Sequence, residues 1–112
     1  MAQTKKLGQE CWQEYLGMFS SGNRGRMITI ELADISVGNQ SLVDLVPLLA
    51  IDYDPENKGD DLVITTGMDA VEYTHRISAP GEIWEFQDDN GKVTALEIIE
   101  RKGAKTIVTF KS

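Results

Sequence analysis

The sequence predicts an α+β fold: an N-terminal helix packed on a bent antiparallel β-meander, or on a partly closed barrel, of six to seven strands. Apolar residues recur with the helical period of 3.6 only in residues 9–20, and from residue 26 onward they alternate with the period of 2 typical of strands. The connections are short, and no second helix is long enough to join parallel strands. At 112 residues the chain is expected to form a single domain, residues 1–112.

The predicted helix carries its apolar side chains on one face. They are Cys11, Trp12, Tyr15, Leu16 and Phe19. Residues 21–25 then contain Ser, Gly and Asn, which favour a helix end. A helix this short is marginal in isolation and needs packing against a sheet. We therefore expect a helical lid, with Cys11 buried beside Trp12.

The rest of the chain reads as strands and turns. The strands are expected at residues 26–33, 42–54, 61–66, 71–77, around Trp84 and Phe86, at 93–100 and at 106–110. The turns are expected at residues 38–40, 79–81, 89–91 and 102–103. Pro47 marks an edge, a bulge or a strand start, because proline cannot donate to a ladder. The hairpin of residues 48–66 is expected at the centre of the sheet, and the last strand at an uncovered edge.

Composition narrows the functional classes. The net charge is −7, with 11 basic residues scattered among 18 acidic ones, so we expect no nucleic-acid binding and no binding to an anionic membrane. No apolar run reaches the length of a membrane span, and the first residues lack the apolar core of a signal peptide. The single cysteine, Cys11, cannot form an internal disulfide. These features predict a cytoplasmic protein, and no motif predicts a cofactor.

Short motifs spread over nearly the whole chain resemble a known family. They are Trp12, Tyr15 and Phe19-Ser20; Ile30-Glu31; Pro47-Leu48, Ile51 and residues 59–64; His75-Arg76-Ile77 and Pro80; Leu96-Glu97-Ile98; and Thr109-Phe110. The chain resembles a family of small bacterial proteins, each about 110 residues long, known only as a domain of unknown function. The resemblance implies a bacterial cytoplasmic protein, and it implies no activity and no catalytic residue.

An acidic loop is the first candidate site. Its carboxylates are Asp52, Asp54, Glu56 and Asp60, with Asn57 and Asp61 beside them. Clustered oxygen ligands suit calcium, and the start of the loop imitates an EF-hand. The imitation then fails, because the expected glycine and the final glutamate are absent and no helices flank the loop. The alternative is a solvated hairpin tip made of turn-forming residues.

A second candidate site consists of Tyr73, His75 and Trp84, which could line a small-ligand pocket in a mini-barrel. The alternative for His75, the only histidine, is a half-buried sheet residue bonded to a neighbour. No serine lies in a nucleophile-elbow motif, and a buried Cys11 would be inert, so we do not expect an enzyme.

Arg24 and Arg26 are the only closely spaced arginines and form a candidate anion site for a carboxylate or phosphate. Alternatively, they bond the carbonyl groups at the helix C-terminus.

These observations favour a small non-enzymatic interaction or regulatory module. We expect it to form a homodimer, or to bind another protein, through a sheet edge or a sheet face. The alternatives are a ligand-binding mini-barrel and a calcium-binding acidic loop.

Overall fold

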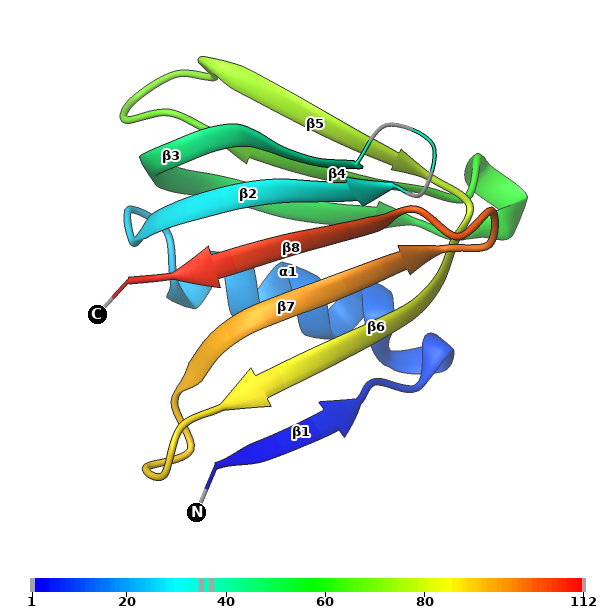
Figure 1. Cartoon of the computed structure of the whole chain (residues 1–112), viewed down its shortest axis with the longest axis horizontal. Coiled ribbons are helices and arrows are strands. Elements are labelled where there is room, and N and C mark those ends of the chain that lie inside the picture. The colour runs from blue at the N-terminus through cyan, green and yellow to red at the C-terminus, as the bar shows by residue number, and fades with distance from the viewer. Residues whose placement is uncertain (1, 35, 37, 112) are drawn as a thin grey trace.

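The computed structural model describes residues 2–34, 36 and 38–111 (Figure 1). It confirms an antiparallel α+β fold. The elements are β1 (Gln3–Lys6), the 3-10 turn η1 (Gln9–Cys11), α1 (Trp12–Gly22), β2 (Met27–Asp34), β3 (Gly38–Asp54), η2 (Glu56–Lys58), β4 (Asp61–Thr66), β5 (Tyr73–Ser78), β6 (Pro80–Gln87), β7 (Val93–Glu100) and β8 (Lys105–Phe110). The described residues thus form eight strands rather than six to seven. The strand that sequence reasoning missed is β1, whose four exposed polar residues show no apolar alternation.

The strands lie in the order β1-β6-β7-β8-β2-β3-β4-β5. This is not one meander, because the runs β2 to β5 and β6 to β8 are joined by the long-range pairing of β8 with β2. The order is also open, since β1 and β5 stand at opposite ends and do not pair. The sheet is therefore bent and open, and of the two predicted arrangements the partly closed barrel is not the one observed.

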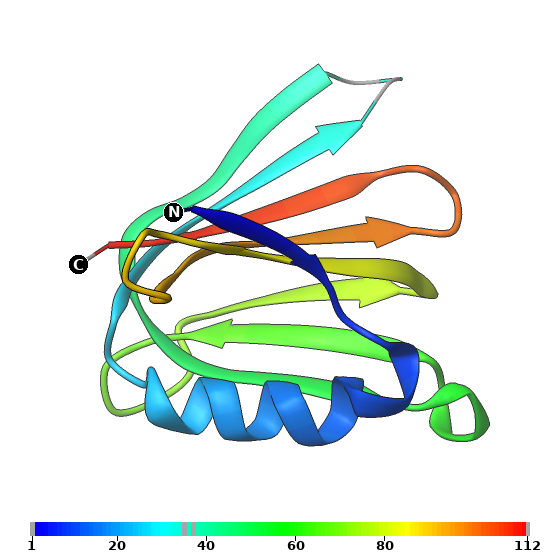
Figure 2. The same cartoon turned by 90° about the horizontal axis from the view of Figure 1, so that it is seen from below.

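A sharp corner in β3 folds this order into two layers (Figure 2). Residues 38–47 pair with β2, whereas residues 48–54 pair with β4. At the corner Leu45 has a φ of 53°, and the pairing with β2 shifts register, which is the signature of a bulge. Pro47 lies two residues further on, so of the three predicted settings (an edge, a bulge or a strand start) the structure places it beside a bulge. The first layer holds β1, β6, β7, β8, β2 and residues 38–47; the second holds residues 48–54, β4 and β5.

The core lies between the layers and under α1. The helix packs beside residues 48–54, where the Ser20 hydroxyl reaches the Ile51 carbonyl at 3.4 Å. Trp12 meets Tyr53 edge-on, with 5.3 Å between the ring centroids, and its indole nitrogen donates to the Leu7 carbonyl. The predicted helical lid is thus confirmed. The largest fully buried side chains are Trp12, Leu16, Ile28, Ile30, Leu48, Ile51, Leu62, Ile64, Ile77, Ile83, Leu96 and Ile98.

Two expectations about position in the sheet are wrong. The C-terminal strand β8 is not an edge, because β7 and β2 pair with it on either side. The hairpin of residues 48–66 is not central, since only β5 separates it from one end of the order. The first error arises because β8 pairs with β2, which is distant in the chain, and the second because β5 does not pair with the next strand, β6; no local pattern encodes either.

Two local expectations are also wrong. Cys11 is exposed, because a 3-10 turn precedes the helix and rotates its side chain off the apolar stripe. Residues 38–40 form the start of β3 rather than a turn. The hairpins at residues 89–91 and 102–103 are confirmed, each with a glycine at positive φ, and the Asp88 amide bonds the Lys92 carbonyl at 2.9 Å. The chain also reverses near residues 79–81, but it does so at Ala79, and the strands on either side do not pair.

Candidate interaction surface

The outer face of the first layer is the broadest sheet surface that another element does not cover (Figures 1 and 2). The strand register shows which side chains lie on this face. Lys6 lies opposite Trp84, Trp84 opposite Glu97, and Glu97 opposite Ile107. Residues opposite each other on neighbouring strands share a face. We call this set the outer row; it crosses four strands, with Phe86 and Ile99 in the flanking rows.

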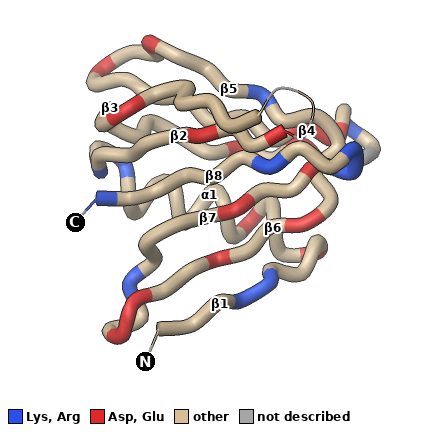
Figure 3. Tube along the Cα trace, viewed as in Figure 1, with Lys and Arg blue, Asp and Glu red and all other residues tan. Residues whose placement is uncertain are grey.

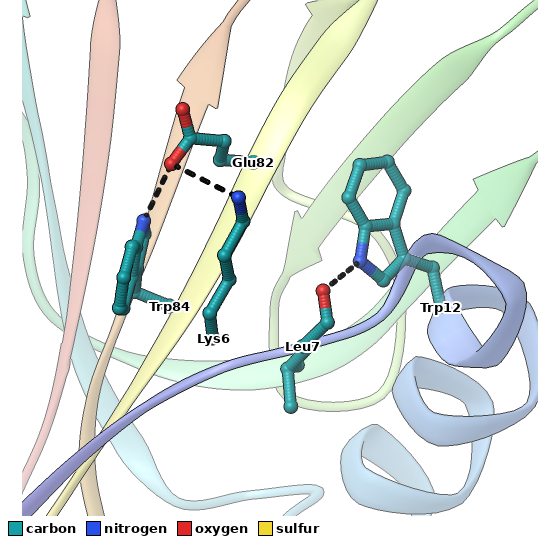
Figure 4. A network of polar contacts seen from close by, with 5 residues as sticks. All are labelled: Lys6, Leu7, Trp12, Glu82 and Trp84. Atoms are coloured by element: carbon teal, nitrogen blue, oxygen red, sulfur yellow. Dashed lines mark hydrogen bonds and ion pairs between the residues drawn. The ribbon is translucent and has the colours of Figure 1, made fainter.

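Trp84 is the largest side chain of the outer row and is only half-buried. Its indole nitrogen donates to Glu82 Oε1 at 2.9 Å (Figure 4). Lys6 lies 5.9 Å from the Trp84 ring centroid and 3.8 Å from the same carboxylate oxygen. An amphipathic aromatic side chain, orientated by polar neighbours and open to solvent, is the type of residue that dominates protein interfaces.

Charged residues of both signs lie along the strands of this face (Figure 3). Lys105 pairs with Glu97 at 3.1 Å, and the partly exposed Ile107 lies next to that pair. Such pairs contribute little to stability because water screens them. The outer face is therefore a mixed apolar and charged surface rather than the strongly acidic one that the net charge suggests.

The opposite face of the same strand contains a polar cluster that sequence reasoning missed. Glu85 is 3% exposed and lies between Ile83 and Gln87 on the core side of β6. The Tyr15 hydroxyl and the Gln87 side-chain amide both donate to its carboxylate. Burial raises the pKa of Tyr15 well above its ordinary value, and the hydrogen bond to Glu85 raises it further, so this phenol stays protonated. The cluster is satisfied by its own members and joins α1 to β6.

Alternation could not have identified Glu85. Apolar residues occupy both phases of β6, with Ile83 in one and Trp84 and Phe86 in the other. Trp84 and Phe86 share a face of β6, and that face is the outer one. The neighbouring strand indicates which face of β6 is buried, because Leu96 lies opposite Glu85 and is itself fully buried.

The residues of the predicted ligand site do not come together. His75 is half-buried on the core side of β5, where its Nε2 lies 3.1 Å from the Thr106 hydroxyl of the first layer. Burial lowers the pKa of His75. Tyr73 lies at the start of the same strand, whereas Trp84 is on the outer face of the other layer.

Two shallow clefts, with volumes of about 270 and 290 Å³, lie elsewhere. The first is lined by Ala33, Asp34, Asn39, Gly103 and Lys105, and the second by Lys6, Leu7, Gly8, Gln9, Trp12 and Gly81. None of the predicted ligand residues lines either cleft.

The two arginines also act separately. Arg24 is exposed, whereas Arg26 reaches inward. The Arg26 guanidinium donates to the carbonyls of Lys111 at 2.8 Å and Val93 at 3.0 Å, and it lies over the Phe110 ring. Burial lowers the pKa of Arg26. Arg26 thus connects β2 to the end of β8 and the start of β7, while Asn23 caps the helix C-terminus through the Phe19 carbonyl.

The acidic loop is dispersed in space. Asp52 and Asp54 are exposed on β3, whereas Asp60 accepts from the Tyr53 hydroxyl at 3.0 Å and pairs with Arg101 at 3.1 Å. Across the described residues, no three His, Cys, Asp or Glu side chains are grouped to hold a metal ion. The side chain of Glu56 lies outside the described residues. Asp60 therefore ties the β3–β4 loop to the β7–β8 loop.

Fold and surface together define a small two-layered α+β protein whose outer face carries a row of mixed apolar and charged residues around the partly exposed Trp84. The chain belongs to the family of unknown function DUF5335, whose model matches residues 3–112. The expected family resemblance is thereby confirmed.

The chain is similar to an uncharacterized protein of Aquifex aeolicus, with 28% identity over 108 residues that cover 96% of this chain and 92% of the relative. No solved structure is significantly similar to it. Within the described residues, no helix combines the length and the apolar character that crossing a bilayer requires.

Proposed function

We propose that this protein is a non-enzymatic interaction module that forms a homodimer through the outer face of its first layer. The observation that carries the proposal is the outer row: Trp84 and Ile107 face solvent in line, with charged partners between and beside them. Aromatic residues inside a polar rim are the compositional mark of a protein interface.

The charges of the outer face are compatible with binding a second copy of the same face. A chain of net charge −7 repels itself over most of its surface. On the outer face, however, Lys6 and Lys105 alternate with acids of the same rows, of which Glu97 is one. A two-fold axis through such a surface can set cations against acids in both directions.

The size of the face is also adequate. Six strands separated by about 4.8 Å and about 20–25 Å long span roughly 500–600 Å² in projection. A standard interface buries about 800 Å² of accessible surface per partner. Because accessible surface exceeds projected area, the outer face approaches that value.

The placement of the other candidate residues supports a binding role over catalysis. His75 is engaged with Thr106 across the core, and Asp60 with Tyr53 and Arg101. These side chains hold the fold together. A cytoplasmic location and a regulatory role remain predictions of the sequence.

The test is the molar mass in solution, measured by light scattering after size exclusion from 1 to about 200 µM, a range that spans micromolar dimers. We expect a dimer for the native chain and a monomer for Trp84→Glu, because a charge is then buried in the interface. Val71→Glu is the matched control: it places the same charge at an exposed apolar residue in the β4–β5 connection and leaves the dimer intact.

Ile107→Lys provides a second variant on the outer row in case Trp84→Glu fails to fold. A strictly monomeric native chain over the whole range would overturn the proposal. So would a dimer that survives both outer-row variants.

A further inference from the structure

Within the described residues, three strand edges of the two layers are free, and they differ in charge. Strand β1 presents Lys5 and Lys6, and β5 presents Arg76. Residues 38–43 of β3 read Gly-Asn-Gln-Ser-Leu-Val and carry no charge. Charged residues on an edge discourage pairing with another chain, and lysine is the commonest of them. Among the described residues, 38–43 are the longest stretch of free edge without a charged side chain, and the exposed Asp44 follows directly after them.

The edge of β3 is also the most accessible. Residues 31–34 of β2 and 38–41 of β3 form an arm that extends beyond the body of the molecule (Figure 2). Within the described residues, β2 is the only strand that pairs with this half of β3. Asn39, Gln40 and Ser41 are all exposed. A row of backbone donors and acceptors about six residues long is therefore open to a partner.

Acidic residues lie near both ends of this open edge. Asp44 is exposed just beyond one end, and Asp34 lies across the hairpin from Gly38 at the other. Hydrogen bonds from the Ser36 hydroxyl and amide hold the pKa of Asp34 below its ordinary value, so that side chain is an anion at neutral pH. If two copies paired antiparallel along residues 38–43, the Asp44 of each would approach the Gly38 end of the other. Like charges so placed oppose pairing.

We propose that residues 38–43 are a docking edge for an extended segment of a partner protein whose uncharged stretch is flanked by lysine or arginine. The segment would add a strand beside β3, with backbone hydrogen bonds supplying affinity and the flanking cations meeting Asp34 and Asp44. The docking edge borders the outer face but uses backbone groups in the plane of the sheet rather than the outward side chains of the outer row, so a dimer and a docked strand are compatible.

The experiment uses a capped peptide, Lys-Thr-Val-Thr-Val-Thr-Lys, titrated into the full isotope-labelled chain. Amide shifts are followed by NMR in the presence of 150 mM salt. We expect saturable shifts confined to residues 38–43 and their β2 partners, with a Kd on the order of 0.1–1 mM. The counterpart peptide Glu-Thr-Val-Thr-Val-Thr-Glu should bind at least about threefold more weakly.

Charge reversal at Asp44 directly tests whether the acidic residues beside the docking edge select the peptide. Asp44→Lys should weaken the Lys-flanked peptide about threefold and strengthen the Glu-flanked one by a similar factor. Asp54→Lys is the matched control: it changes net charge equally on the second layer and should leave both affinities unchanged, because salt screens charges beyond about 8 Å.

Several outcomes would overturn the docking edge: no saturable shifts at residues 38–43, equal binding of the two peptides, or the same response to both lysine variants. A second copy in place of the peptide would be revealed by concentration-dependent shifts at residues 38–43 without any ligand. Shifts of β6 and β7 amides on dilution report the outer-face dimer instead, so the two proposals succeed or fail independently.

Discussion

The two faces of β6 contradict the simple rule that apolar side chains point inward. On the outer face Trp84 is partly exposed, whereas on the core face Glu85 is 3% exposed. Both arrangements are stable because each polar group has a partner: the Trp84 indole donates to Glu82, and Glu85 accepts from Tyr15 and Gln87. Burial alone therefore does not distinguish a structural residue from an interaction residue; the hydrogen-bond partners within the chain do.

The largest expected effect separates the two tryptophans. Trp12 is 1% exposed and packs on Tyr53, so Trp12→Ala should lower the free energy of unfolding by about 3–5 kcal/mol. Trp84→Ala should lower that of the monomer by less than about 1.5 kcal/mol, because its site is half open. Urea unfolding followed by circular dichroism measures both, in samples dilute enough to be monomeric. Equal losses would contradict the assignment of Trp84 to a binding surface.

The next effect concerns the buried carboxylate. Glu85→Ala removes the buried acceptor of two partly buried donors, so we expect a loss of about 2–3 kcal/mol in the free energy of unfolding. Glu82→Ala, the control on the outer face of the same strand, should cost less than about 0.5 kcal/mol. A double-mutant cycle with Tyr15→Phe should give a favourable coupling of about 1–3 kcal/mol. Additive losses would show that the Tyr15–Glu85 bond is not formed.

A smaller effect follows from the histidine that bridges the layers. Because burial lowers the pKa of His75, the folded chain binds a proton less readily than the unfolded chain. Above pH 6.5 both states are neutral at this site and its contribution is fully present; as pH falls below the unfolded pKa, that contribution is lost. Urea midpoints at pH 7.5 and 5.5 should therefore differ less for His75→Asn than for the native chain. An unchanged difference would mean that His75 does not contribute to acid sensitivity.

The smallest effect is expected at the rim of the outer row. Lys6→Ala removes an exposed ion pair and a cation–π contact, so the monomer should lose no more than about 0.5 kcal/mol. The same substitution should increase the dimer dissociation rate only modestly compared with Trp84→Glu. If Lys6→Ala lowered the free energy of unfolding as much as Glu85→Ala, the outer face would contribute to folding rather than to binding.

Local chemistry made much of the fold predictable. The helix, seven of the strands and the two glycine hairpins each have a periodicity or a turn residue that identifies them. Strand β1 has neither, because its residues are polar and it exists only through pairing with β6. Cys11 was misplaced since a 3-10 turn breaks the helical phase just before Trp12.

The candidate surfaces were predictable only in kind. A sheet face or edge was expected, but the C-terminal strand that seemed open lies in the middle of the order. The open edge belongs instead to residues 38–43, whose Gly-Asn-Gln start predicts a turn. Tyr73, His75 and Trp84 were grouped on aromatic character, yet strand order separates Trp84 from the other two.

The sequence by itself determined the class of fold, the helix and most strands, because each depends on residues that are close together in the chain. Tertiary structure alone decided which edges are free, which face of β6 is buried and where Glu85 lies. Those features depend on the β8–β2 pairing and on the corner in β3, which bring together segments that are distant in the chain. The functional proposals rest on this second group, since an interaction surface is made of what the fold leaves uncovered.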